Sequence, residues 1–252
     1  ICMRTLFPRL LNEPELLQTA YSVDSIVVES IFVAGPALIA FFVAIGWRSG
    51  AVLFAAACAI AGSILFLRTP AIKAWLPPAS HSQRSLLGPL RNRRLLVLYA
   101  ATLMYSIAFG LLEVAVTALA TAQGRPAAAG LILALASVGS GLGALVYGSR
   151  GWAMPPERQY VIAQIAMATG LFVLAPVTNL YLLAALCVFA CSPMAPVIAL
   201  QSVLVARFTR RDRLAESFTW AATALLSGVS AGIALGGTIA ESHAPQSAML
   251  AA

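Results

Sequence analysis

A stripe of polar side chains runs along one strongly apolar segment of this chain. Its members recur at steps of three or four residues, so they share one face of a helix: Tyr99, Thr102, Ser106, Gly110, Glu113 and Thr117. Glu113 lies deep in the segment, where exposing a carboxylate to lipid costs on the order of 3 kcal/mol or more. We expect the stripe to line water or a substrate and Glu113 to take up and release a proton. The alternative is a structural carboxylate bonded to a neighbouring helix.

Other candidate residues lie in neighbouring apolar segments. Glu29 is about one turn inside the first of them, and either a gating or coupling role or an interfacial ion pair is expected. Asp24 is nearer to water and is expected to be solvated or to form an interhelical pair. Three prolines each remove a backbone hydrogen bond and are candidate hinges: Pro36, Pro193 and Pro196. Three glycines at four-residue steps predict close helix packing: Gly228, Gly232 and Gly236.

Composition indicates that membrane-spanning helices position these residues. Apolar residues make up 60% of the 252 residues and charged residues 10%, against about 45–50% and about 25% in soluble domains. Seven apolar runs are each close to the ~20 residues that cross a bilayer as a helix. They are 26–45, 51–67, 95–120, 127–147, 160–177, 180–205 and 218–240. Polar and apolar residues do not alternate in them, so an all-helical transmembrane bundle is predicted rather than a barrel.

The basic residues fall almost entirely on one side of the predicted membrane. Of 16 Lys and Arg residues, all but Arg48 and Arg125 lie in the N-terminal tail or in the loops 68–94, 148–159 and 206–217. The positive-inside rule makes these loops cytoplasmic. Membrane topology accounts for the basic charge, so no nucleic-acid partner is expected.

Few residues suggest metal or enzyme chemistry. Cys187 and Cys191 share a helix face, but no His or carboxylate accompanies them in their run, so packing is favoured over metal binding. A membrane enzyme acting on lipid would need clustered polar residues, yet His81 and His243 lie in loops on opposite sides. We expect no cofactor, no metal and no enzymatic activity.

The chain is expected to be a fragment of a longer polytopic protein. It begins at Ile1 rather than at Met, and a further apolar run begins near Ser247. A weak internal repeat aligns Ser30 and Gly35 with Ser227 and Gly232 in equal orientation, as in transporters built from two parallel halves.

The chain resembles the major facilitator superfamily, and its bacterial exporter-like members in particular. The resemblance is carried by the segments 20–25, 88–90 and 110–116 and by Gly35-Pro36, which is similar to the antiporter motif. Ile39 and Ala40 stand where that motif has a glycine pair. The family has twelve membrane-spanning helices. The resemblance implies that this chain covers the end of the fourth helix, the fifth to eleventh helices and the start of the twelfth.

The resemblance also implies domains and a function. Residues 1–67 would end the N-terminal six-helix half, 68–94 would be a cytoplasmic linker, and 95–252 would be the C-terminal half with a truncated last helix. Secondary active transport of a small molecule by alternating access is expected in an inner or plasma membrane, with proton-coupled export favoured. The partners would be substrate, protons, lipid and the missing N-terminal helices. A symporter of the same fold and a non-transporting scaffold or receptor are the alternatives.

Overall fold

The computed structural model describes residues 2–11, 13–69, 88–210 and 212–242. Within these ranges the chain is helical and contains no strand. The elements are α1 (Cys2–Leu10), α2 (Pro14–Ala44), α3 (Arg48–Arg68), the 3-10 turn η1 (Pro89–Arg91), α5 (Arg93–Ala122), α6 (Pro126–Gly148), α7 (Pro156–Leu174), α8 (Leu180–Ala190), α9 (Met194–Phe208) and α10 (Leu214–Ser242).

Five helical segments of the described chain are long and apolar enough to cross a membrane. They are Ser49–Arg68, Arg93–Ala122, Pro126–Gly148, Leu180–Phe208 and Leu214–Ala240. Each of the seven predicted runs lies mostly in helix, but α2 and α7 are not among these five. The all-helical prediction is confirmed, and the five segments fit a multi-pass membrane protein.

The chain divides into two compact units. One contains residues 1–30 and 84–252, and the other contains residues 31–83. In the second unit α2 ends at a turn in which Gly46 has a φ of 74°, a conformation that favours glycine. Phe42 then packs edge-on against Trp47 with ring centroids 5.8 Å apart. The predicted linker at 68–94 lies largely outside the described residues.

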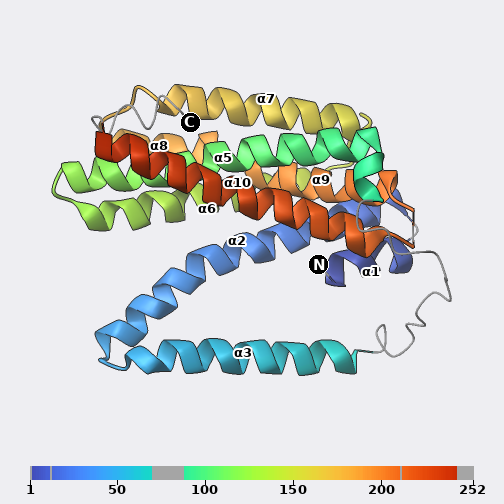
Figure 1. The fold of residues 1–252 in the computed structure, drawn as a ribbon, viewed down its shortest axis with the longest axis horizontal. Coiled ribbons are helices and arrows are strands. Elements are labelled where there is room, and N and C mark those ends of the chain that lie inside the picture. The colour runs from blue at the N-terminus through green and yellow to red at the C-terminus, as the bar shows by residue number, and fades with distance from the viewer. Residues whose placement is uncertain (1, 12, 70–87, 211, 243–252) are drawn as a thin grey trace. The chain divides into compact units, whose positions relative to one another are not determined.

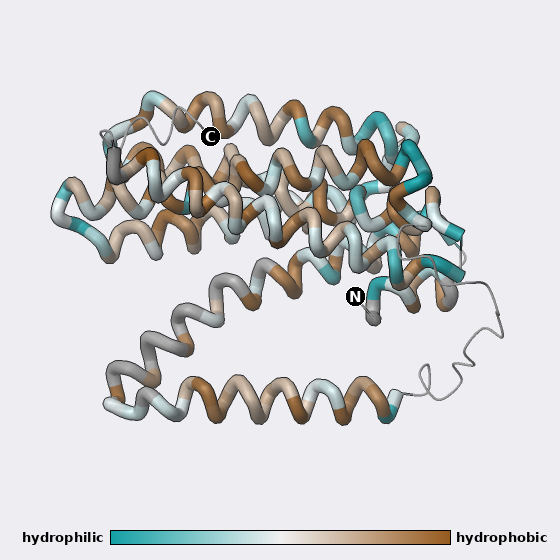
Figure 2. The backbone as a smooth tube through the Cα atoms, viewed as in Figure 1, coloured by the Kyte–Doolittle hydropathy of each residue, from teal (hydrophilic) through white to brown (hydrophobic). Residues whose placement is uncertain are grey.

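The first unit is a bundle in which α5 pairs most extensively with α10 (Figure 1). α6 packs on α8 and α9, α7 packs on α9 and α8, and α1 packs on α10 and α9. Hydrophilic residues gather near the ends of these helices and apolar residues fill their lengths (Figure 2). This distribution is the one expected of helices whose middle sections lie in lipid.

Glycines bring α5 and α10 into backbone contact. A Cβ added to Gly228 would lie 2.6 Å from the carbonyl oxygen of Leu103, and one added to Gly232 would lie 3.0 Å from the Cα of Gly110. A Cβ on Gly236 would lie 2.9 Å from the side chain of Val114. The four-residue glycine spacing therefore coincides with a close helix–helix interface.

The apolar run 180–205 is broken into α8 and α9 by a turn at residues 191–193. Pro193 precedes the first residue of α9, and Pro196 lies in its first turn, where backbone N–H groups lack helical partners. From α6, Ser140 Oγ accepts a hydrogen bond of 3.0 Å from the N–H of Ala195. Gly143 packs against the backbone of Ser192. α6 thus supports the break that the prolines permit.

Candidate functional site

A polar pocket lies where α1 and the start of α2 meet α9 and α10. Its volume is about 210 Å³. The polar residues that line it are Arg4, Asp24, Gln201 and Ser202, and apolar residues including Val28, Ile198 and Phe218 complete its walls. All of these residues belong to the first unit.

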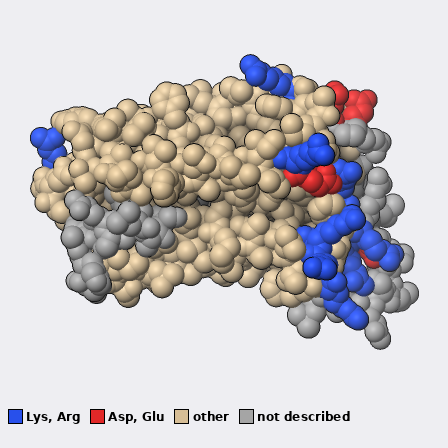
Figure 3. All heavy atoms as spheres, turned by 90° about the horizontal axis from the view of Figure 1, so that it is seen from above, with Lys and Arg blue, Asp and Glu red and all other residues tan. Residues whose placement is uncertain are grey.

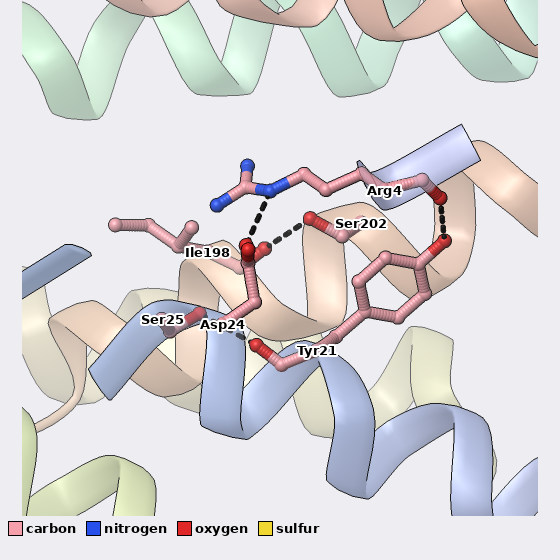
Figure 4. A network of polar contacts seen from close by, with 6 residues as sticks. All are labelled: Arg4, Tyr21, Asp24, Ser25, Ile198 and Ser202. Carbon is pink, nitrogen blue, oxygen red and sulfur yellow. Dashed lines mark hydrogen bonds and ion pairs between the residues drawn. The ribbon is translucent and has the colours of Figure 1, made fainter. Parts of the chain in front are cut away.

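An ion pair forms one wall of the polar pocket (Figure 4). Arg4 Nε lies 2.5 Å from Asp24 Oδ2, and the two side chains are only 24% and 16% exposed. Asp24 thereby forms an interhelical pair, which was one of the two states expected for it. Opposite the pair, Ser202 Oγ donates to the carbonyl of Ile198 at 2.9 Å.

Tyr21 fixes the backbone that carries the ion pair. Its hydroxyl donates to the carbonyl oxygen of Arg4 at 3.0 Å, and its own carbonyl accepts from Ser25 Oγ at 2.9 Å. Burial raises the pKa of the Tyr21 phenol, so the hydroxyl keeps the proton that it donates. The ring lies between Phe7 and Phe218, at centroid distances of 5.4 Å and 6.2 Å. An aromatic cluster therefore connects α1, α2 and α10 beside the pocket.

Gln201 lies on α9 between the polar pocket and a second groove. Its Oε1 accepts a hydrogen bond of 2.8 Å from the hydroxyl of Tyr105, and both side chains are buried. Gln201 lines the polar pocket, whereas Tyr105 lines a groove between α5 and α7. This pair was not identified from the sequence. Two adjacent polar residues within an apolar run, Gln201 and Ser202, could have marked the position as a candidate site.

Glu113 lies in a separate open groove between α5 and α10. The groove has a volume of about 540 Å³, and Thr117, Thr121 and Ile233 also line it. The Glu113 side chain is half-buried, and it has no hydrogen bond or ion pair with the described residues. Its carboxylate is thus accessible to solute or proton, as a coupling role requires, but it lies outside the polar pocket.

Three other members of the predicted polar stripe, Tyr99, Ser106 and Gly110, face α10, whereas Thr102 contacts Tyr160 of α7. Tyr99, Thr102, Ser106 and Gly110 are all buried. The Tyr99 hydroxyl donates to the carbonyl of Ser217 at 3.0 Å. Gly110 lies against the backbone of Val229. The stripe is therefore split in this structure between a packed interface and the Glu113 groove.

The remaining predicted residues are dispersed. Gly35 lies in α2 in the second unit with open space around it. Glu29 and Pro36 are in α2, and their side chains lie outside the described residues. Pro193 and Pro196 are at the start of α9, and the Gly228, Gly232 and Gly236 row packs on α5. The roles predicted for them in gating remain predictions.

Removing one partner of the Arg4–Asp24 pair should destabilise the junction. Because the pair is partly buried, we expect a coupling free energy of about 1–2 kcal/mol, between the values of exposed and fully buried pairs. The measurement is a double-mutant cycle of Arg4→Gln and Asp24→Asn in detergent, followed by unfolding in SDS. A second cycle of Arg210→Gln and Asp212→Asn is the control, since Arg210 is largely exposed in its pair with Asp212. Equal coupling in the two pairs would contradict the assignment.

The described residues contain no group of three or more His, Cys, Asp or Glu side chains placed to bind a metal ion. Comparison with known proteins gives no match to any family model, curated protein or solved structure.

Proposed function

We propose that this chain belongs to a secondary transporter that carries a small molecule across a membrane, with proton-coupled export as the favoured direction. The observation that supports this most is the polar pocket. It brings an ion pair and the Gln201 amide together where α1 and the start of α2 meet α9 and α10. A few convergent polar groups in an otherwise apolar pocket are typical of a small-molecule binding site.

The walls of the pocket support an alternating-access mechanism. Arg4 and Asp24 belong to the half that the resemblance to the major facilitator superfamily assigns to residues 1–67, and Gln201 and Ser202 belong to the other half. In a bundle of about seven spans, rocking of the halves would open and close a pocket made from both. Separation at this end would break the contact of Tyr21 with Phe218.

Coupling to protons is assigned to Glu113. Its carboxylate faces an open groove and has no basic partner among the described residues. A carboxylate in that state can gain and lose a proton without breaking an ion pair. Substrate would bind in the polar pocket and protons at Glu113, so the two sites are distinct.

Flux measurements on the purified protein test this function. Proteoliposomes with an internal pH-sensitive dye and an imposed pH gradient are challenged with amphiphilic cations, sugars and small organic acids. We expect at least one compound to drive proton movement that is absent from protein-free liposomes. Proton movement opposite to labelled substrate indicates export by antiport, and movement in the same direction indicates a symporter. Absence of flux for every compound, in folded protein, would favour a scaffold or receptor.

A further inference from the structure

A second, larger groove extends along the outside of the first unit between α5 and α7. Its volume is about 780 Å³. Its lining is almost entirely apolar, and several lining side chains are exposed, including Val97, Met104, Ile165 and Phe172. We call it the α5–α7 groove. It is unconnected to the polar pocket, since the Tyr105–Gln201 pair stands between them.

The dimensions of the α5–α7 groove match part of a bilayer. Along α5 its lining extends from Arg94 to Ala108, and along α7 from Glu157 to Phe172, with Ala175 just after the helix. At 1.5 Å per residue the shorter wall is about 21 Å long, more than half of a ~30 Å hydrocarbon core.

The two charged residues of the lining, Arg94 and Glu157, lie at one end of the groove. Arg94 lies at that end, with its guanidinium 5.5 Å from the ring centroid of Phe208. Arg94 forms no ion pair with the described carboxylates, because Glu157 at the same end already pairs with Arg207 at 3.1 Å. In Figure 3 basic side chains gather at one end of the molecule, and the long middle of the visible face carries no charge.

An occupant must therefore be apolar along most of its length and negatively charged at one end. We propose that the α5–α7 groove binds an anionic phospholipid, with an acyl chain between α5 and α7 and the headgroup phosphate at Arg94. Arginine binds phosphate through several N–H donors, and its stacking on Phe208 holds the guanidinium at the mouth of the groove. A zwitterionic lipid adds a positively charged ammonium group near Arg94. Repulsion between the two positive charges makes such a lipid bind more weakly.

The charge requirement is tested at Arg94 with a matched arginine. Arg125 lies over the Tyr181 ring at 5.7 Å, at the other end of α5 from Arg94. The protein is purified in detergent and titrated with phosphatidylglycerol or phosphatidylcholine, and bound lipid is counted by native mass spectrometry. We expect phosphatidylglycerol to bind preferentially, with Arg94→Gln weakening it about five-fold and Arg125→Gln leaving it unchanged. Equal binding of the two lipids, or equal effects of the two variants, overturns the proposal.

The groove itself is tested by filling it. Ala168 lines the α5–α7 groove, whereas Ala166 is exposed on the same helix but outside it. We expect Ala168→Trp to reduce binding of phosphatidylglycerol and Ala166→Trp to have no effect, with both variants equally helical by circular dichroism. If Ala168→Trp leaves lipid binding intact, the lipid lies elsewhere and the proposal fails.

Discussion

Glu113→Gln should abolish the dependence of transport on the proton gradient while leaving membrane insertion intact. Glutamine keeps the size and hydrogen-bonding ability of the side chain but cannot exchange a proton in the accessible pH range. Because the carboxylate faces a groove and has no ion-pair partner among the described residues, no structural pair is lost. The measurement is substrate flux into proteoliposomes with and without an imposed pH gradient.

A matched carboxylate controls for a general effect of charge. Glu15 is exposed in the first turn of α2, and Glu15→Gln should preserve the proton dependence. Downhill exchange of labelled substrate should persist in Glu113→Gln, since the polar pocket is unaltered. Full proton dependence in Glu113→Gln would remove this residue from the coupling mechanism.

Gly232→Leu is expected to produce the largest loss of stability. A Cβ at this position already meets the backbone of Ile107 and Gly110, and backbone cannot move aside as a flexible side chain can. Overpacking typically costs about 1–3 kcal/mol, and contact with backbone puts this case at or above the upper end. We expect α5 and α10 to separate, so that the variant aggregates or unfolds at much lower SDS concentration than the parent.

Gly237 provides the control for that substitution. It lies on α10 one residue after Gly236, and a Cβ there would have no neighbour within 4 Å. Gly237→Leu should therefore behave like the parent protein or gain stability from its higher helix propensity. If both leucine variants unfold alike, the effect comes from α10 itself and not from its contact with α5.

Local patterns in the sequence predicted much of the fold. Apolar runs of bilayer length gave the helices because a helix satisfies its own backbone hydrogen bonds in lipid. The row Gly228, Gly232 and Gly236 indicated a close interface, and α5 occupies it. Pro193 indicated where the run 180–205 would break. These features depend on residues within one helical turn of each other or on a short repeat. They can therefore be predicted from a single amino-acid sequence.

The site was less predictable because it depends on partners far apart in the sequence. Periodicity placed Tyr99 and Glu113 on one face, but it could not show that α10 covers one end of that face and leaves the other open. Arg4 and Asp24 are 20 residues apart, and Tyr105 and Gln201 are 96 apart. Only the turn between α1 and α2 and the packing of α9 on α5 bring these pairs together. Polarity marked such residues as candidates without identifying their partners.

The interruption between α8 and α9 bears on how the molecule can move. The backbones of α5 and α10 are in contact, so we expect the two helices to move together as a rigid body. α8 and α9 share only a three-residue joint, with the N–H of Ala195 held by Ser140. Tilting of α9 about that joint would carry Gln201 and the adjoining wall of the polar pocket without displacing α8. Any rocking of the bundle would then pivot at residues 191–193, where turn hydrogen bonds such as that from the N–H of Ser192 to the carbonyl of Phe189 replace a continuous helix.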